Sequence, residues 1–343
     1  MRQIRLGRTE LMVSAVGFGG IPIQRLPERE AIQVVRRCLD QGVTFLDTAN
    51  GYTTSEERIG KAISGRREGL VLATKTQARD AGGVAQHLAL SLERLDVETI
   101  DLYQFHCVSS AEDYEKVIAP GGPLDVAREA LVAGKVKHIG LTSHSMETAL
   151  RAVRSGHFST IMFPFNLVAN EAAKELIPLA LEEDVGYIAM KPLAGGALDN
   201  ATLAFKYLRQ FPQILPIPGI ERAEEMDEIV GIMEGQAGMS PDEESAIEHL
   251  RAELGSRFCR RCGYCQPCPE GVPIQTLMIM DSILKRMPPA NVFSSLAPAV
   301  ESTEDCIECG ECEDKCPYGL PIREMIKEHA ELFRREMARA GLN

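Results

Sequence analysis

The chain has 343 residues, of which 45% are hydrophobic and 25% charged, and its formal net charge is −12 at pH 7. This composition is that of a globular protein. The negative charge argues against nucleic acid, which selects a basic protein face, and against an anionic membrane surface. The N-terminus lacks the apolar run of a signal peptide, and no stretch reaches the ~18 apolar residues of a membrane span. We therefore expect a cytoplasmic protein that binds neither nucleic acid nor membrane.

From the N-terminus, a hairpin pattern around Leu6–Thr9 comes first, and then apolar strand-like segments alternate with segments of helical periodicity. The expected strands are Ser14–Gly20, Thr44–Ala49, Leu70–Lys75, Ile100–His106, His138–Ser143, Thr160–Phe165, Gly186–Lys191 and Ile214–Ile217. The expected helices are Glu28–Asp40, Glu56–Ile63, Val84–Leu95, a longer segment ending at Ala133, Met146–Arg154, Glu171–Glu183, Ala201–Arg209 and Arg222–Met233.

This alternation predicts parallel strands joined by crossover helices. Eight such units over about 230 residues have the size of a (β/α)8 TIM barrel. A doubly wound sheet is the alternative, and it usually carries G-x-G-x-x-G after its first strand. Here the corresponding stretch, Gly17–Pro22, fails that pattern and has a proline where a helix should start. The barrel is therefore favoured.

A second domain is expected after the barrel. We place the boundary at a Gly-Ser pair, which gives a barrel over residues 1–255 and a cysteine-rich domain over 256–343. Helical patterns at Gln275–Arg286 and Ile322–Ala340 make that second domain mainly helical. The resulting fold class is α/β with a helical appendage.

Four polar residues lie at or just after the ends of predicted barrel strands, namely Asp47, Tyr52, Lys75 and His106. The C-terminal ends of barrel strands form the catalytic face of such a fold. A tyrosine with a pKa of about 10 is a weak acid at neutral pH, but a cation beside its oxygen lowers that pKa. Lys75 would supply the cation and Asp47 would fix its position. His106 would orient a substrate oxygen, so the four together predict a proton-transfer site, although each alone could be structural.

The first 235 residues or so contain the stretches Phe45–Tyr52, Leu72–Lys75, Leu102–His106, Gly134–Ser143, Pro192–Gly196 and Ile217–Ile220. These motifs resemble those of the aldo-keto reductases. The resemblance implies the (β/α)8 fold and hydride transfer between a nicotinamide cofactor and a carbonyl. It also implies Tyr52 as general acid, with Lys75 and Asp47 tuning it and His106 orienting the substrate.

The same resemblance implies a nicotinamide-binding wall, from which this chain departs. Ser143 matches the family pattern, whereas His144 stands in place of an asparagine and Met162 in place of a glutamine. Met190 replaces the tyrosine that stacks on the nicotinamide ring. A methionine can still make a sulfur–aromatic contact, but it cannot replace the hydrogen bonds of glutamine.

On the adenosine side, Gly195 and Gly219 belong to the matching motifs. Glu225 stands where the family often has an arginine for the 2′-phosphate of NADPH, with Arg222 nearby, and Glu228 matches an acidic residue that faces the adenine. The resemblance therefore leaves NADH and NADPH equally open as the cofactor.

Eight of the ten cysteines form two tightly spaced groups. They are Cys259, Cys262, Cys265 and Cys268, followed by a proline, and Cys306, Cys309, Cys312 and Cys316, also followed by a proline. The second group has the bacterial ferredoxin spacing for a [4Fe–4S] cluster, while the first is one residue short before its last cysteine. A zinc site with four thiolates is the alternative. The spacing favours iron–sulfur.

In two-cluster ferredoxins the fourth cysteine of each run ligates the other cluster. We therefore expect Cys316 to join the first three cysteines and Cys268 to join Cys306, Cys309 and Cys312. One cluster with spare thiols is the alternative. Acidic residues crowd the second group and predict a lower reduction potential there, unless they form only a solvated surface.

The expected function is that of an NAD(P)-dependent aldo-keto reductase-like oxidoreductase acting on a small carbonyl or alcohol, with a fused iron–sulfur domain. A hydride carries two electrons and a cluster carries one, and we find no flavin motif to bridge them. The clusters are therefore either structural or exchange electrons with a redox partner. The alternative function is an electron-transfer subunit that docks on such a partner through its iron–sulfur domain.

Overall fold

The computed structural model describes residues 1–235 and 238–342. They form two compact units. The first holds Met1–Ala194 and Leu198–Ser240, and the second holds Gly195–Ala197 and the chain from Pro241 onward. Helix α10 (Pro241–Gly255) is thus grouped with the second unit. The domain limits of 1–255 and 256–343 stay a prediction.

Within residues 1–235, eight parallel strands form one sheet in the order β10-β9-β8-β7-β6-β5-β4-β3. A parallel bridge between Gly19 and Gly219 joins its two edges, and Gly19 N also donates to Pro218 O at 2.8 Å. The predicted barrel is confirmed. Its strands are β3 (Phe18–Gly19), β4 (Phe45–Asp47), β5 (Val71–Thr76), β6 (Ile100–Phe105), β7 (Val136–Thr142), β8 (Thr160–Pro164), β9 (Gly186–Met190) and β10 (Leu215–Ile217).

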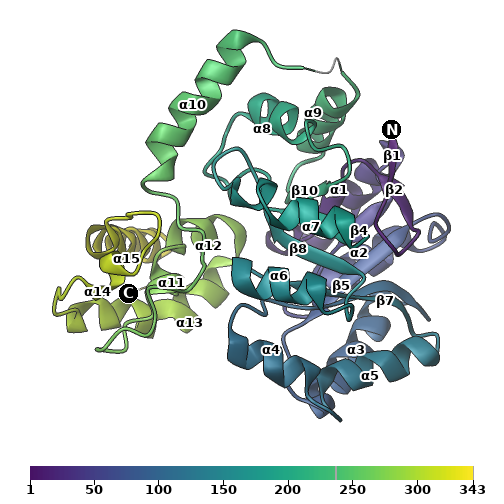
Figure 1. The fold of residues 1–343 in the computed structure, drawn as a ribbon, viewed down its shortest axis with the longest axis horizontal. Coiled ribbons are helices and arrows are strands. Elements are labelled where there is room, and N and C mark those ends of the chain that lie inside the picture. The colour runs from purple at the N-terminus through teal and green to yellow at the C-terminus, as the bar shows by residue number, and fades with distance from the viewer. Residues whose placement is uncertain (236–237, 343) are drawn as a thin grey trace. The chain divides into compact units, whose positions relative to one another are not determined.

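Helices surround these strands (Figure 1). They are α1 (Glu28–Asp40), α2 (Ser55–Ile63), α3 (Ala81–Leu95), α4 (Ala111–Ile118), α5 (Pro123–Val132), α6 (Met146–Arg154), α7 (Leu176–Glu182), α8 (Ala201–Leu208) and α9 (Ala223–Glu234), with 3-10 turns η1 (Pro22–Arg25) and η2 (Glu171–Ala173). The long helical segment ending at Ala133 proves to be α4 and α5. Gly121 adopts the left-handed φ of 70° between them, and Pro123 starts the new helix, where a missing N–H costs nothing.

An N-terminal hairpin closes one end of the barrel. Strands β1 (Gln3–Arg5) and β2 (Met12–Ser14) pair antiparallel, as the sequence predicts. Their buried side chains pack in one apolar cluster with Phe45 and Val71, the first residues of β4 and β5. The hairpin therefore fills the N-terminal end of the barrel and leaves the C-terminal ends of the strands for chemistry.

The second unit is mainly helical and has its own apolar core. Its helices are α10, α11 (Ile274–Leu277), α12 (Met280–Arg286), α13 (Pro289–Glu301), η3 (Ser302–Asp305), α14 (Glu311–Asp314) and α15 (Ile322–Arg339). In that core the rings of Phe293 and Phe333 pack edge to face with their centroids 5.3 Å apart, in the same cluster as Leu277 and Met280. The predicted helix over Gln275–Arg286 is interrupted between α11 and α12.

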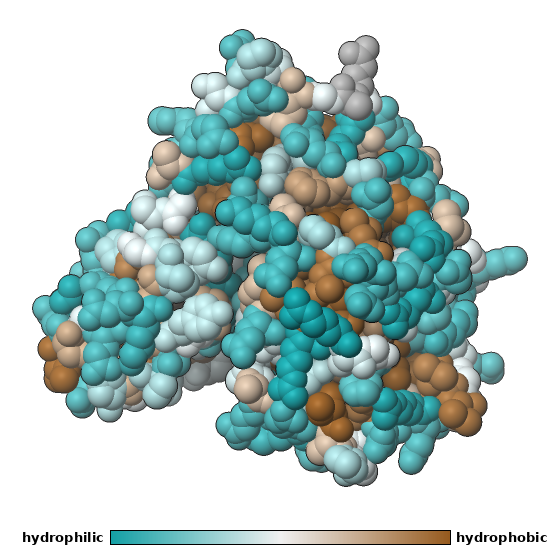
Figure 2. Space-filling view, in the orientation of Figure 1, coloured by the Kyte–Doolittle hydropathy of each residue, from teal (hydrophilic) through white to brown (hydrophobic). Residues whose placement is uncertain are grey.

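The outer surface is mixed in character. Figure 2 shows mostly hydrophilic side chains on the face that it draws, with hydrophobic residues in smaller separate groups. Within the described residues, no helix combines the length and the apolar character needed to cross a bilayer.

The barrel seam generates a stability prediction. A Cβ added at Gly19 would lie 2.7 Å from Pro218 O, which is main chain and cannot rotate away. We expect Gly19→Ala to lower the free energy of unfolding by about 1–3 kcal/mol because the seam must open. The control is Gly231→Ala in α9, where nothing lies within 4 Å of the added Cβ. Gly231→Ala should raise the free energy of unfolding by about 0.5–1 kcal/mol, because alanine favours a helix more than glycine does. Urea unfolding followed by circular dichroism checks both, and equal effects would contradict the prediction.

Candidate functional site

A buried ion pair joins the ends of β4 and β5. Lys75 Nζ donates to Asp47 Oδ2 at 2.6 Å and to the carbonyl oxygen of Thr48 at 2.6 Å. Asp47 is 3% exposed and Lys75 1%. A buried charge is tolerated only when it is paired and hydrogen-bonded, so each residue fixes the other. The two strands place them together because β4 and β5 are direct neighbours.

A third side chain completes the partners of Asp47. Gln104 Nε2 donates to Asp47 Oδ1 at 3.3 Å, and Gln104 itself is fully buried. It lies in β6, in register with Lys75. Sequence analysis missed this residue, although a polar side chain in a strand of mostly apolar residues was a usable signal. Both carboxylate oxygens of Asp47 are therefore hydrogen-bonded.

Burial and charge pairing oppose each other in this pair. Burial disfavours the ammonium of Lys75, but attraction to Asp47 and Tyr52 outweighs it, so the pKa of Lys75 lies above its ordinary value. Burial raises the pKa of Asp47, against the opposing effects of Lys75 and Gln104. The 2.6 Å contact is that of an ammonium with a carboxylate. Lys75 consequently stays cationic through neutral and mildly alkaline pH.

Tyr52 and His106 lie at the same end of the barrel. Lys75 Nζ is 5.1 Å from the centroid of the Tyr52 ring. The rings of Tyr52 and His106 have centroids 5.7 Å apart and meet edge to face at 78°. Arg79 Nη2 donates to the carbonyl oxygen of His106 at 2.7 Å and holds its backbone. The structure thus brings all four predicted residues together at the C-terminal ends of β4, β5 and β6.

The residues predicted for the nicotinamide wall differ from one another in burial and in hydrogen bonding. Ser143 and His144 directly follow β7 and are buried. The Ser143 hydroxyl donates to Ser145 O at 3.2 Å and accepts from Ser145 N at 3.1 Å, so it stabilises its own turn. Met162 is 2% exposed within the interior cluster. Met190 ends β9 and is half-buried.

The start of α9 is capped by a carboxylate. Glu225 Oε2 accepts from the backbone N–H of Glu221 at 2.9 Å and from that of Arg222 at 3.1 Å. Its other oxygen pairs with Arg222 Nε at 3.1 Å. Arg222 and Glu225 therefore partner each other, while Glu228 is exposed. Negative charge at a helix N-terminus is stabilising, so the cap suits Glu225.

The two predicted glycines have different surroundings. Gly219 forms the barrel seam with Gly19, and a Cβ there would approach Pro22 Cγ to 2.9 Å. Gly195 adopts a left-handed φ of 69° and is grouped with the second unit. Only Gly219 therefore has a place in the barrel unit itself.

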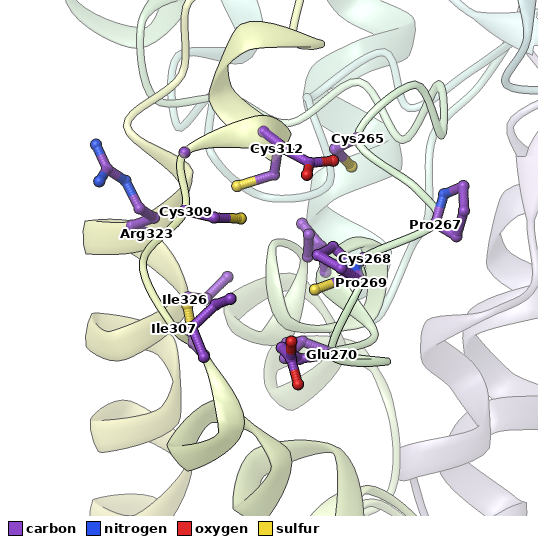
Figure 3. Close-up of a pocket in the computed structure, with 15 residues that line it drawn as sticks. Cys265, Pro267, Cys268, Pro269, Glu270, Ile307, Cys309, Cys312, Arg323 and Ile326 are labelled. Carbon is purple, nitrogen blue, oxygen red and sulfur yellow. The ribbon is translucent and has the colours of Figure 1, made fainter.

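Two cavities in the second unit are lined by cysteines. One, of about 420 Å³, is bordered by Cys265, Cys268, Cys306, Cys309 and Cys312. Figure 3 shows the sulfur atoms of Cys268, Cys309 and Cys312 pointing into the space between the two chain segments that carry them. The other, of about 330 Å³, is bordered by Cys259, Cys262, Cys265 and Cys316. Cys268 thus lies with the second group and Cys316 with the first. This grouping is the one that the predicted exchange of fourth ligands requires, and ligation itself stays a prediction.

The thiols line these cavities in a partly buried setting. Burial raises the pKa of Cys265 to about 12, and it raises those of Cys262 and Cys312 above the ordinary value. Their protons must therefore leave when the thiols bind metal. Among the described residues, no three His, Cys, Asp or Glu side chains gather closely enough to hold a single metal ion.

The two remaining cysteines lie outside both cavities. Cys38 is fully buried on α1, where burial raises its pKa to about 12. Cys107 follows β6 with a left-handed φ of 55° and is half-buried.

Most acidic residues near the second cysteine group have a basic partner in the same unit. Glu311 pairs with Lys315 at 2.9 Å, and Glu313 pairs with Arg323 at 2.7 Å. Glu308 contacts Lys327 in the same way. The acidic stretch is therefore less negative in space than it is in sequence.

Comparison with known proteins bears on both units. The aldo/keto reductase family profile matches residues 15–204, which is more than half of the chain. A profile described as a 4Fe-4S dicluster domain matches residues 258–320. The chain is 31% identical over 219 residues to aldo-keto reductase YhdN of Bacillus subtilis, and the match covers 58% of this chain and 64% of that protein. It is 30% identical over 215 residues to probable aldo-keto reductase 1 of Glycine max, covering 57% and 60%. The chain therefore spans less than two thirds of these relatives.

Solved structures agree on the fold. Aldo-keto reductase AKR11C1 from Bacillus halodurans has a TM-score of 0.65 at 22% identity, over 73% of this chain and 96% of that one. An aldo/keto reductase from Klebsiella pneumoniae in complex with NADP and acetate has a TM-score of 0.62 at 21% identity, over 73% and 95%. With its closed parallel barrel and the profile match over residues 15–204, this chain belongs to the aldo/keto reductase family.

Proposed function

We propose that the protein is a nicotinamide-dependent oxidoreductase that interconverts a small aldehyde or ketone and the corresponding alcohol. The observation that carries the proposal is the buried Lys75 ammonium, held by Asp47 and set 5.1 Å from the ring of Tyr52. A phenol beside a fixed cation can give up its proton near neutral pH, which an isolated tyrosine does poorly. The buried cation beside the phenol therefore supports proton transfer at Tyr52.

Each of the four residues has a distinct task in this proposal. Tyr52 gives its proton to the substrate oxygen during reduction and recovers one from water afterwards. Lys75 stabilises the phenolate left on Tyr52, and Asp47 keeps Lys75 in place. His106, beside the Tyr52 ring, binds the same substrate oxygen. A bound nicotinamide would supply the hydride to the carbonyl carbon.

The chemistry of the predicted wall suits a nicotinamide ring. Met190 offers a half-buried sulfur for contact with the ring face, and His144 offers a ring nitrogen for the carboxamide. Met162 and Ser143 would form the wall behind them. A solved aldo/keto reductase of the same fold, from Klebsiella pneumoniae, is in complex with NADP, which is consistent with a nicotinamide cofactor for this chain.

The cap of α9 bears on which nicotinamide cofactor is used. Glu225 already accepts the backbone N–H groups of Glu221 and Arg222. A 2′-phosphate placed there would meet a carboxylate whose oxygens are already hydrogen-bonded, and like charges repel each other. We therefore propose that NADH is preferred over NADPH. In this proposal Glu228 lies near the adenosine, and Gly219, which has no side chain, lets the cofactor approach the main chain closely.

The second unit is proposed to hold two [4Fe–4S] clusters. The thiols of each cavity would be the ligands, with Cys259, Cys262, Cys265 and Cys316 for one cluster and Cys268, Cys306, Cys309 and Cys312 for the other. The match to a dicluster domain supports this number. Such clusters exchange single electrons, and the thiols of this chain would set their positions.

A second candidate function is electron transfer to a redox partner through this unit. The observation that favours it is exposure beside the larger cavity. Ile307 is 64% exposed, and its neighbour Cys309 is exposed as well. Apolar exposure beside a cluster ligand suits transient docking of another protein.

The first test concerns the proton donor. Tyr52→Phe removes one oxygen and should lower carbonyl reduction by at least about a hundredfold, because general acid catalysis contributes about 10²–10⁴-fold. The measurement is NADH and NADPH oxidation with a panel of small aldehydes. The matched control is Tyr114→Phe on α4, a buried tyrosine outside the site, which should keep full turnover. Unchanged turnover of Tyr52→Phe would overturn the reductase proposal and leave electron transfer as the surviving candidate.

The second test concerns cofactor choice. Glu225→Gln keeps an oxygen for the helix cap but removes the charge, so kcat/KM with NADPH relative to NADH should rise about tenfold or more, an effect of about 1.4 kcal/mol. Glu182→Gln makes the same chemical change at an exposed residue at the end of α7, outside the predicted cofactor site, and serves as the control. An unchanged ratio in Glu225→Gln would contradict the proposed role of this carboxylate.

The third test assigns the cluster ligands. The wild type should contain about eight irons, four per cluster, and Cys268→Ala about four. Because Cys268 and Cys309 are assigned to one cluster, the double variant Cys268→Ala/Cys309→Ala should also keep about four. Cys268→Ala/Cys262→Ala should lose nearly all iron. Iron and sulfide assays with EPR spectroscopy give the counts.

Two outcomes of that assay would correct the assignment. If the two double variants gave the reverse result, each cysteine group would bind its own cluster. If the wild type held only about four irons, the single-cluster alternative would stand. Cys38→Ala, a buried cysteine outside both cavities, should leave the iron content unchanged.

A further inference from the structure

The loop that carries Tyr52 is hydrogen-bonded through its main chain to β5, the strand that carries Lys75. Thr48 N donates to Ala73 O at 2.9 Å, and Asn50 N donates to Lys75 O at 3.0 Å. Within the loop, Tyr52 N donates to Ala49 O at 2.9 Å. The distance between Tyr52 and Lys75 therefore depends on how firmly Asn50 is held against β5.

A buried carboxylate and an arginine meet at that point. Glu56 on α2 is fully buried, and Thr74 Oγ1 donates to its Oε1 at 2.6 Å. Arg94 on α3 extends one nitrogen, Nη1, to Glu56 Oε2 at 3.5 Å and to Asn50 O at 3.1 Å. Glu56 is fully buried whereas Arg94 is 26% exposed, so removing Arg94 would leave a buried carboxylate without its charge partner.

The side chain of Asn50 is held by the same helix. Asn50 Nδ2 donates to Ser91 Oγ at 3.3 Å and to His87 O at 3.4 Å, both on α3. Helix α3 thus holds Asn50 in two places. Arg94 bonds its backbone carbonyl oxygen, and Ser91 and His87 bond its side-chain amide. A chain of hydrogen bonds thus runs from Glu56 through Arg94 to Asn50, two positions before Tyr52.

We propose that Glu56 and Arg94 form a brace that positions Tyr52 against Lys75, and this inference rests on the proposed reductase function. Both are positioning residues, because they act through Asn50 and the main chain rather than on substrate. Thr74 ties the brace to the strand position next to Lys75. The brace thereby links the proton donor and its cation to a common support.

The effect on chemistry follows from distance. Proton transfer and phenolate stabilisation both require Tyr52 close to Lys75, and a displacement of about 1 Å can cost about a hundredfold in rate. If the loop relaxes, the phenolate loses part of the field of Lys75, so the pKa that governs the alkaline limb of the pH profile rises. Cofactor binding, which depends on other strands, should be spared.

The experiment uses the full holoprotein with three variants. Arg94→Met removes the charge at similar length, Arg94→Met with Glu56→Gln removes both charges together, and Arg94→Lys restores a cation. We expect kcat to fall about tenfold to a hundredfold in the first two, with the alkaline limb shifted upward and KM within about twofold. Arg94→Lys should recover much of the loss. The control is Arg154→Met, which breaks the exposed pair of Arg154 with Glu175. This variant should keep the wild-type kcat and the wild-type pH profile.

A second readout does not depend on activity. Hydrogen–deuterium exchange of the peptide covering residues 48–55 should be faster in Arg94→Met and in the double variant than in the wild type, while circular dichroism stays unchanged. The double variant guards against misfolding because it leaves no buried charge unpaired. Folded variants with wild-type kcat, pH profile and exchange would overturn the brace. If the wild type reduces no carbonyl but the variants still exchange faster than the wild type, the proposed function is overturned and the brace stands.

Discussion

The buried contact between Lys75 and Asp47 is the interaction on which the barrel unit's chemistry depends. A lysine that is 1% exposed would be too costly to keep charged without its 2.6 Å partner. That requirement fixes β4 beside β5 and turns both side chains into the barrel end that the N-terminal hairpin does not fill. It also explains why a glutamine, Gln104, is tolerated in a buried strand, since it satisfies the second oxygen of Asp47.

The same logic extends outward from that contact. The loop after β4 could move freely if it were held only by its own turn, and its hydrogen bonds to β5 and α3 prevent this. Catalytic loops are usually mobile, so a loop fixed to the strand that holds its cation is a stronger arrangement for proton transfer. The buried Glu56 belongs to this support, because its partners Thr74 and Arg94 come from β5 and α3.

Sequence reasoning identified the features that hydrophobic periodicity and residue spacing determine. Alternating strands and helices predicted the barrel, and strand-end positions predicted Asp47, Tyr52, Lys75 and His106. It missed Gln104 and the pairing of Glu56 with Arg94, because partners of buried polar groups depend on the register between strands and helices far apart in sequence. The start of the helical segment ending at Ala133 was left open, and α4 in particular was not identified, because the run Pro120–Pro123 of two prolines and two glycines separates it from α5.

Charge shows the same limit of one-dimensional reasoning in the second unit. Counted along the chain, the acidic residues around Cys306–Cys316 predict a strongly negative surface and a lower reduction potential there. In space, Glu308, Glu311 and Glu313 face Lys327, Lys315 and Arg323. A paired carboxylate exerts a weaker field at a distance than a free one, and salt largely screens the remaining field beyond ~10 Å. The difference in potential between the two proposed clusters should therefore follow the solvent exposure of their ligands, such as the exposed Cys309, more than the number of acidic residues.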